Sequence, residues 1–269
     1  MALQIRQKEI LEIAHRTGRV LVEDLAEQFG VTPQTIRRDL TDMCDRRLLT
    51  RVHGGAMLES GTANLGYEAR RGIAADEKDR IGRICAAAIP DGSSLFINIG
   101  TTTEAVARAL LSHRDLLVIT NNINVANTLS ANPNCEIIVA GGMLRRSDGG
   151  LIGEATAEFI KQFKVDFAVV GASAIDEDGS LLDYDYREVR VARTIIEHSR
   201  AVYLVADSSK LTRSAPVRIA GIQAIAAFFT DTLPSERLRQ VCIQHGVDVF
   251  TLDDSGTGAN SMPSESESP

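Results

Sequence analysis

Apolar side chains in the first fifty residues recur at the spacing of short amphipathic helices. Residues 3–16 and residues 22–29 each gather their apolar side chains on one helical face. Gly30 is suited to end the second helix, and Thr32, as a side-chain N-cap, begins a third helix that runs to about Arg46. The pattern therefore predicts three short helices in close succession.

A hairpin and a weakly patterned segment follow these helices. The run LLTRVHGGAML, residues 48–58, predicts two short strands that turn at Gly54 and Gly55. Helices followed by such a hairpin predict a winged helix-turn-helix domain over residues 1–58. Small and polar residues then dominate without a strong period, which predicts an interdomain linker over residues 59–72.

Apolar strands alternate with helical stretches in the rest of the chain. The predicted strands are SLFINI, LLVIT, CEIIVA, DFAVVGA, AVYLVA, AIAAFFT and VDVFTL. Such alternation predicts a mainly parallel sheet covered by helices, so we expect one α/β domain over residues 73–254. Residues 255–269 contain almost no apolar side chains, and we predict that they form a disordered tail.

Composition and charge narrow the class of protein. The net charge of -7 argues against a protein that coats nucleic acid along its whole surface. Residues 1–60 hold nine basic and nine acidic side chains, so the excess acidity lies in the larger domain. The four cysteines lack zinc-site spacing, and no apolar run has the length of a membrane span or signal peptide. We expect a cytoplasmic protein without a metal, a cofactor or a membrane partner.

The outward face of the third predicted helix carries side chains that suit DNA reading. Gln34 and Arg38 lie opposite the apolar face, and such side chains form bidentate hydrogen bonds with adenine and guanine. Threonine hydroxyls, the other arginines and the hairpin suit contacts to the DNA backbone. The candidate DNA-binding residues are Thr32, Gln34, Thr35, Arg37, Arg38, Thr41, Arg51 and His53. The alternative is an ordinary three-helix module whose arginines pair with the helix's own aspartates.

Three successive predicted strands end in polar or glycine-rich loops. Gly100–Thr103 follows SLFINI and opens a helix, where free N–H groups and the helix dipole favour a phosphate. The next two strands end at Asn121–Asn122 and at Gly141–Gly142. Because ligands bind at the carboxyl ends of parallel strands, we expect these loops to converge on one pocket. A single loop of this kind is more often an ordinary turn and helix cap.

Charged side chains at the same edge of the sheet complete the candidate site. Asp207 and Lys210 follow the strand AVYLVA, and Lys210 suits either a phosphate or a surface salt bridge. The acidic stretch from Asp176 to Glu188 offers carboxylates, among them Asp183 and Asp185, to substrate hydroxyls. The candidate effector-binding residues are Asn98, Gly100, Thr101, Thr102, Thr103, Asn121, Asn122, Gly141, Gly142, Arg145, Asp185, Asp207 and Lys210.

Two groups of motifs resemble the DeoR family of repressors. GVTPQTIRRDL followed by LLTRVHGGA resembles the family signature over the helix, turn and wing. LFINIGTTTEAVARALL, TNNINVANTL, AGGMLRRSDGGLIGEAT and GSLLDYDYREVR resemble its effector domain, which is similar in fold to ribose-5-phosphate isomerase and glucosamine-6-phosphate deaminase. These four runs are most similar to family members that respond to glycerol 3-phosphate.

The resemblance implies a repressor of glycerol 3-phosphate metabolism genes. Such a protein binds a palindromic operator as a dimer or tetramer, and a small phosphorylated effector releases it. One position departs from the family pattern, because Asn98 stands where members commonly carry Asp. This departure puts in doubt which group that side chain contacts.

Other functions remain open at this stage. A sugar-phosphate isomerase or deaminase would use the same fold, lysine and carboxylates as acid and base. However, such an enzyme has no use for a DNA-reading domain, and glycerol 3-phosphate lacks the carbonyl that an isomerase needs. A nucleotide-binding regulator is disfavoured because no glycine-rich nucleotide motif follows any strand. A DeoR-type repressor that responds to another sugar phosphate is the third alternative.

Overall fold

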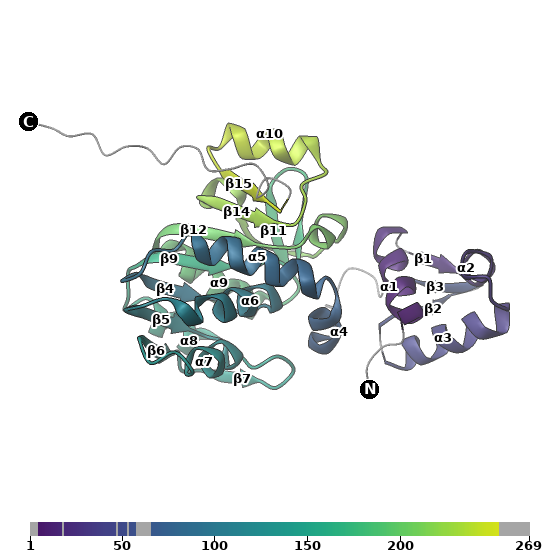
Figure 1. The fold of residues 1–269 in the computed structure, drawn as a ribbon, viewed down its shortest axis with the longest axis horizontal. Coiled ribbons are helices and arrows are strands. Elements are labelled where there is room, and N and C mark those ends of the chain that lie inside the picture. Colours follow the sequence, from purple (N-terminus) through teal and green to yellow (C-terminus); the bar gives the residue numbers. More distant parts are fainter. Residues whose placement is uncertain (1–4, 18, 47, 53, 58–65, 253–269) are drawn as a thin grey trace, which may run out of the picture.

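The computed structural model describes residues 5–17, 19–46, 48–52, 54–57 and 66–252. Figure 1 shows a small N-terminal part, here called the head, and a larger part, here called the sensor domain. The head contains α1 (Ile5–Thr17), β1 (Arg19–Leu21), α2 (Val22–Phe29), α3 (Pro33–Asp45), β2 (Thr50–Val52) and β3 (Gly55–Met57). His53 and the tail over residues 255–269, about which the sequence made predictions, lie outside the described residues.

The junction between α2 and α3 follows from local backbone chemistry. Gly30 ends α2 with a φ of 62°, a left-handed conformation that glycine adopts without steric cost. The Thr32 side chain accepts a hydrogen bond from the backbone N–H of Thr35, and Pro33 occupies the first helical turn. The predicted end of the second helix and start of the third are confirmed.

The predicted hairpin is confirmed and belongs to a larger sheet. β2 and β3 pair in antiparallel fashion, and β1 adds to the other edge of β3. The sequence analysis did not predict β1, because its three residues are too few to show a period. A Cβ atom at Gly55 would lie 1.9 Å from the Val20 carbonyl oxygen, so only glycine allows β3 to approach β1 this closely.

A short helix lies in the segment that we expected to be a linker. α4 (Tyr67–Gly72) has six residues, and residues 59–65 before it are outside the described ranges. Ala69 and the following Ile73 pack against the apolar core of the head. Since six residues complete fewer than two turns, the helix leaves no repeating apolar pattern in the sequence.

The sensor domain is built on a seven-stranded sheet in the order β15-β14-β12-β9-β4-β5-β6, and every neighbouring pair is parallel. All seven predicted strands are confirmed. The strands of this sheet are β4 (Ser94–Ile97), β5 (Leu116–Thr120), β6 (Cys135–Val139), β9 (Val165–Val170), β12 (Ser199–Val205), β14 (Ala227–Thr230) and β15 (Asp248–Thr251).

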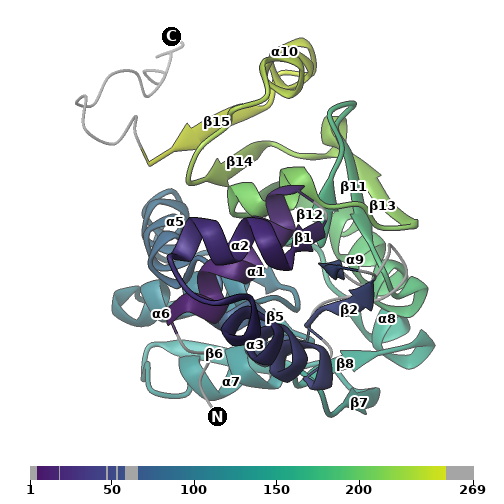
Figure 2. The same cartoon turned by 90° about the vertical axis from the view of Figure 1, so that its right-hand side faces the viewer.

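Helices cover both faces of this sheet, as predicted (Figures 1 and 2). One apolar core lies between the sheet and α5, α6 and α7, and a second lies between the sheet and α8, α9 and α10. The helices are α5 (Ala75–Ala87), α6 (Thr101–Ala109), α7 (Ile123–Leu129), α8 (Glu154–Ile160), α9 (Tyr186–Glu197) and α10 (Glu236–Gln244), with 3-10 turns η1 (Leu110–Ser112), η2 (Ser208–Thr212) and η3 (Ile222–Ala224).

Additional strands follow the carboxyl ends of the main strands. β7 (Met143–Arg145) and β8 (Gly150–Ile152) form a hairpin after β6, whereas β10 (Ala174–Ile175), β11 (Ser180–Asp183) and β13 (Val217–Gly221) form a second small sheet. The sequence pattern did not predict these short strands.

The order of the strands creates a crevice at one point. From β4 the chain builds outward through β5 and β6, and from β9 it builds in the other direction through β12, β14 and β15. β4 and β9 are neighbours, so the loops that leave their carboxyl ends diverge. Open parallel sheets bind ligands at such a topological switch point. In the described part of the chain, no helix is both long enough and apolar enough to span a membrane.

Candidate functional site

The outward face of α3 carries two arginines, while two of the helix's three aspartates contact α1. Arg6 Nε lies 2.6 Å from Asp39 Oδ2, and the Gln7 side chain donates to Asp42 Oδ2 over 2.9 Å. Gln34, Arg37 and Arg38 are exposed, while Thr35 and Thr41 are half-buried. No hydrogen bond or ion pair joins Arg38 to another described residue. Arg38 is therefore free to contact a DNA base.

A side-chain hydrogen bond joins the hairpin β2–β3, the wing, to α3. Arg51 Nη2 donates to Thr41 Oγ1 over 2.8 Å. Thr32, another predicted DNA contact, is committed to the cap of α3, where its hydroxyl also lies 3.0 Å from that of Thr35. Arg37 lies 3.5 Å from Glu23 at the surface, a pair that contributes little to stability.

A cleft of about 580 Å³, including its open mouth, lies at the switch point between β4 and β9. It is bounded by the β4–α6 loop, the segment after β9, α4, β11, α9 and η2. The polar and glycine residues that line it are Arg70, Asn98, Gly100, Thr101, Thr102, Thr103, Gly171, Ser173, Asp183, Glu188 and Lys210.

The β4–α6 loop presents free hydrogen-bond donors to this cleft. Gly100 has a φ of 153°, which L side chains rarely adopt. Thr103 fixes the loop, because its hydroxyl donates toward the carbonyl oxygens of Asn98 (2.7 Å) and Gly100 (2.8 Å). The hydroxyls of Thr101 and Thr102 have no partner among the described residues. The first N–H groups of α6 also point out of the helix, as at every helix N-terminus.

Lys210 brings an unpaired ammonium group to the same cleft. The side chain is 7% exposed, and within the described residues it has neither a hydrogen bond nor a carboxylate within 4.0 Å. Burial, followed by the nearby Arg213 guanidinium, holds the pKa of Lys210 well below its usual value. The Asp207 carboxylate favours the charged form of Lys210, but it lies more than 4.0 Å from the ammonium group.

Further cations lie around Lys210. Lys78 Nζ lies 3.9 Å from Asp207 Oδ2, and burial lowers its pKa to about 8. Nε and Nη1 of Arg213 are buried without a hydrogen-bond partner among the described residues. Burial opposes ionisation of Asp207, but Lys210 and Lys78 hold the pKa of this carboxyl below its usual range. Positive charge therefore exceeds negative charge at the base of the cleft.

Carboxylates line the opposite side. Ser173 donates to Asp183 Oδ2 over 3.1 Å, and the Tyr184 N–H donates to Oδ1 over 2.6 Å. Burial raises the pKa of Asp183. Asp185 caps α9 by accepting the Arg187 N–H, and the Arg187 hydrogen bond lowers the pKa of its carboxyl. Asp183 and Asp185 thus lie two residues apart in the chain but have different surroundings.

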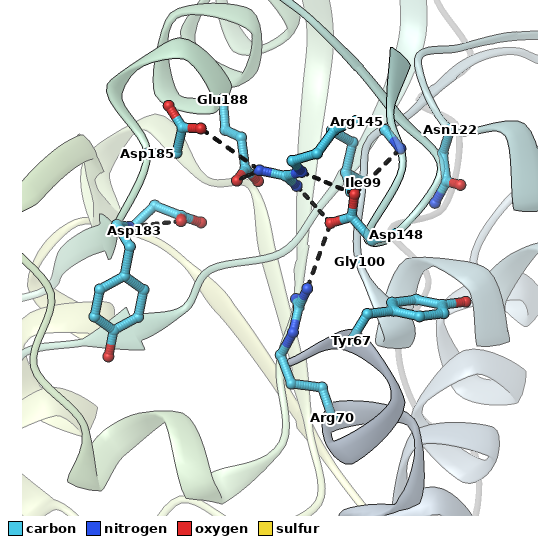
Figure 3. Close-up of polar contacts among 12 residues, drawn as sticks. Tyr67, Arg70, Ile99, Gly100, Asn122, Arg145, Asp148, Asp183, Asp185 and Glu188 are labelled. Carbon is cyan, nitrogen blue, oxygen red and sulfur yellow. Dashed lines mark hydrogen bonds and ion pairs between the residues drawn. The ribbon is translucent and has the colours of Figure 1, made fainter. Parts of the chain in front are cut away.

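A network of ion pairs closes the rim of the cleft (Figure 3). Arg145 contacts three carboxylates, those of Asp148, Asp185 and Glu188. Arg70, from α4, lies 3.4 Å from the same Asp148 carboxylate. Arg145 therefore joins the β7–β8 hairpin to α9, and Arg70 joins α4 to that hairpin.

Comparison with protein families identifies both parts of the chain. Residues 6–62 match the DeoR-like helix-turn-helix domain, and residues 73–232 match the DeoR C terminal sensor domain. The chain belongs to the DeoR family of transcriptional repressors. The resemblance found in the sequence motifs is confirmed, and so is the combination of a winged helix-turn-helix with a parallel α/β domain.

Curated relatives of this DeoR-family chain include two repressors with the same name. The glycerol-3-phosphate regulon repressor of Escherichia coli (strain K12) is 50% identical over 242 residues, which cover 90% of this chain and 96% of the relative. That of Haemophilus influenzae (strain ATCC 51907 / DSM 11121 / KW20 / Rd) is 48% identical and covers 87% of this chain and 91% of the relative. A solved D-ribose-5-phosphate isomerase in complex with phospho-erythronic acid has a TM-score of 0.38 at 15% identity, and it covers 51% of this chain and 54% of its own.

The structure brings part of the predicted effector site of this DeoR-family chain into the cleft. The predicted residues that line it are Asn98, Gly100, Thr101, Thr102, Thr103 and Lys210. Asp207 does not line the cleft but interacts electrostatically with Lys210, while Arg145 and Asp185 belong to the ion-pair network at the rim.

The loops after β5 and β6 do not reach the cleft. The Asn121 side chain donates to the Leu151 carbonyl, and Asn122 caps α7 and donates to Glu104. Gly141 accepts a hydrogen bond from Thr156, and a Cβ at Gly142 would lie 2.0 Å from the Thr156 hydroxyl. These strands lie outward of β4, and β8 bonds to Asn121 at their carboxyl ends. The loops therefore do not converge on one pocket as expected.

The structure also adds residues that sequence reasoning missed. Arg70 and Lys78 stand outside the motifs of the sequence, and Arg213 lies three residues after Lys210. The fold brings all three cations near Lys210. Asp183 and Glu188 belong to the acidic stretch that the sequence analysis singled out, although it named only Asp185 as a site residue. Nothing in the sequence pattern distinguishes these carboxylates.

Asn98 departs from the family pattern, and its own loop supplies one hydrogen-bond partner for its side chain. Its Oδ1 accepts the N–H of Ile99 over 2.8 Å. Its Nδ2 has no partner among the described residues and belongs to a side chain that lines the cleft. An aspartate here would offer the cleft an acceptor, whereas Asn98 offers it a donor.

Proposed function

We propose that this protein represses genes of glycerol 3-phosphate metabolism and leaves its operator when glycerol 3-phosphate binds the cleft. The observation that carries the proposal is the unpaired Lys210 ammonium, which lines the same cleft as the free donors at the N-terminus of α6. The name of the relatives that are 50% and 48% identical supports glycerol 3-phosphate as the effector.

The cleft offers complementary chemistry to each end of that molecule. The phosphate would accept from Lys210, from the N–H groups of residues 101–103 and from the hydroxyls of Thr101 and Thr102. The glycerol hydroxyls would donate to Asp183 and accept from Asn98 Nδ2. One site would then recognise both the charge and the polyol.

We propose that the effector binds without turnover. Glycerol 3-phosphate has no carbonyl for an isomerase to act on, and Glu188 is already neutralised by Arg145. Both carboxylate oxygens of Asp183 already accept hydrogen bonds, from Ser173 and Tyr184. NMR of the effector after prolonged incubation with the protein should show no new signals, and a protein-dependent product would favour the enzyme.

Operator DNA would bind α3 and the wing of two or more heads. If glycerol 3-phosphate binds more tightly to the form that does not bind DNA, then it lowers operator affinity, and operator lowers effector affinity by the same factor. Such factors are typically about 5- to 150-fold.

Calorimetry and DNA binding together test the proposal. We would titrate the protein with glycerol 3-phosphate, ribose 5-phosphate, glucosamine 6-phosphate and glycerol, and measure affinity for a DNA fragment selected with the wild-type protein. Glycerol 3-phosphate should bind most tightly and release the DNA. Lys210→Met and Thr102→Val should each bind glycerol 3-phosphate more weakly than the wild type. For Lys210→Met, which removes a charge, the loss should be at least about tenfold.

Lys161→Met is the matched control, because it removes an exposed lysine outside the cleft. It should bind glycerol 3-phosphate as the wild type does. Preference for another phosphate from the panel would reject the named effector, and equal affinity of wild type and Lys210→Met would reject the cleft.

A further inference from the structure

The short helix α4 contacts both functional parts of the molecule. Toward the head, Ala69 and Ile73 pack on the apolar core that holds α3 in place. Toward the sensor domain, the Tyr67 hydroxyl donates to Glu104 Oε2 over 2.8 Å, and Glu104 belongs to the first turn of α6. Figure 1 shows α4 between the two parts, and Figure 3 shows Tyr67 and Arg70 extending from it in different directions, Arg70 toward Asp148.

The backbone of α4 is held by the same charged cluster that surrounds Lys210. Lys78 Nζ donates to the carbonyl oxygens of Arg70 (2.5 Å) and Ile73 (2.6 Å), while lying 3.9 Å from Asp207. A change of charge in the cleft therefore acts on the groups that position this helix.

Arg70 is poorly satisfied in its present position. Its guanidinium lines the cleft and contacts Asp148 at 3.4 Å, a long distance for an ion pair. Its Nε is buried and has no hydrogen-bond partner among the described residues. Asp148 already receives two hydrogen bonds from Arg145, so it would stay neutralised if Arg70 moved away.

We infer that Arg70 is a ligand of the effector's phosphate, and that its transfer from Asp148 to the phosphate shifts α4 against the head. This inference rests on the proposed function, since it assigns a further ligand and a coupling element to the same cleft. A phosphate at the N-terminus of α6 offers Arg70 more acceptor oxygens than Asp148 does, and guanidinium and phosphate bind in bidentate fashion.

The contact between α4 and the head leaves room for such a shift. An open groove of about 1640 Å³, including its mouth, lies between α4 and the head, and the residues that line it include Lys8, Leu11 and Leu48. Closely packed interfaces resist small displacements, whereas a loosely packed one permits them. Because α1 also holds Asp39 and Asp42 of α3, a displacement of α4 against the head would change the presentation of the DNA-reading helix.

The test compares Arg70→Met with Arg71→Met, its neighbour on α4. Arg71 is exposed and pairs only with Glu68 and the Tyr67 ring in the described structure. Calorimetry with glycerol 3-phosphate and with inorganic phosphate should show at least tenfold weaker binding for Arg70→Met and no loss for Arg71→Met. Arg70→Lys, which keeps the charge, should recover part of the affinity. Circular dichroism would verify that each variant is folded.

Ile73→Ala tests the coupling separately, because it removes packing on the head and no group that lines the cleft. It should bind glycerol 3-phosphate like the wild type, yet release the selected DNA fragment at least threefold less than the wild type does. Full release by Ile73→Ala would overturn the coupling role of α4.

The two proposals fail in different ways. If Lys210→Met loses affinity for glycerol 3-phosphate but Arg70→Met does not, the role of Arg70 is wrong and the proposed function stands. If the folded wild-type protein binds neither glycerol 3-phosphate nor inorganic phosphate, the proposed function fails, and the role of Arg70 fails with it.

Discussion

At the scale of single residues, the cations of the cleft and of the outward face of α3 differ in whether they already have an acidic partner. Arg145 contacts three carboxylates, whereas Lys210 has none within 4.0 Å among the described residues. An anion that enters the cleft must displace existing ion pairs to reach Arg145, but it meets Lys210 at no such cost. The same distinction separates Arg38, which is free, from Arg37, which pairs with Glu23.

Arg38→Ala should reduce affinity for the selected DNA fragment while the protein stays folded. If Arg38 reads a guanine, the loss should be about 1–3 kcal/mol, and it should be confined to sequences that carry that base. A gel-shift titration at fixed salt measures this. Arg200→Ala, an exposed arginine of the sensor domain, is the control, and an equal loss in both variants would remove Arg38 from base reading.

Lys78 should make stability depend on pH. Its pKa is about 8 in the fold and about 10.5 in the unfolded chain, so between these values the unfolded state binds more protons. The contribution of Lys78 to the free energy of unfolding therefore rises with pH between about pH 8 and 10.5. Below pH 8 the buried side chain is charged, and the full cost of burying that charge applies.

The comparison with Lys78→Met isolates this effect. Between pH 7 and pH 9.5, the free energy of unfolding of the wild type should rise by roughly 2 kcal/mol relative to that of Lys78→Met. Urea denaturation at each pH gives both values. A constant difference between the two proteins would show that burial does not lower the pKa of Lys78.

Among elements, close backbone approaches set the positions of the functional segments. β3 passes β1 at Gly55, and α5 crosses α6 at Gly82, where a Cβ would lie 2.7 Å from the Ala105 carbonyl. The first approach holds the wing against the head, and the second sets the direction of the helix whose N-terminus faces the cleft. Loss of either glycine should displace the element that it positions.

Gly55→Ala should abolish specific DNA binding and leave effector binding intact. The added methyl would overlap the Val20 carbonyl oxygen, so β3 would have to separate from β1, at a cost of about 1–3 kcal/mol or more. Gly66→Ala is the control, because a Cβ there meets nothing within 4 Å. Gel shifts and calorimetry with glycerol 3-phosphate would separate the two activities. Retained DNA affinity in Gly55→Ala would show that the wing is dispensable.

At the scale of the whole molecule, recognition of an operator requires more than one head. One recognition helix contacts few base pairs, and palindromic operators mirror the two-fold symmetry of the proteins that bind them. α4 connects each head to a sensor domain, so association of sensor domains would set the spacing of the heads.

The protein should therefore form a dimer or tetramer in solution. Light scattering of the purified protein at micromolar concentration measures the mass directly. A stable monomer that still binds the selected DNA fragment tightly would contradict this expectation. Crosslinking of the DNA complex would then show whether two monomers assemble on the operator.

The sequence by itself determined the helices of the head and the seven main strands of the sensor domain, in their order. Each of the seven main strands is an apolar run bounded by polar residues, and Gly30, Thr32 and Pro33 are local signals for the helix junction in the head. The loop before α6 was also predictable as a local structure, because Gly100–Thr103 combines a permissive backbone with a helix N-terminus within a few residues. These features depend on neighbours in the chain, and a linear pattern records them.

Only the tertiary structure decided which of these residues share a site. β9 inserts next to β4, so the loop of β4 meets Ser173 and Asp183 instead of the loops after β5 and β6. Arg70 reaches the cleft from a segment without pattern, because α4 docks between two folded parts. Lys78, from α5, donates to the α4 backbone at the carbonyl oxygen of Arg70. Whether a charged side chain has a partner depends on groups distant in sequence. The sequence pattern therefore does not show that Arg145 is paired and Lys210 is not; only the fold decides this.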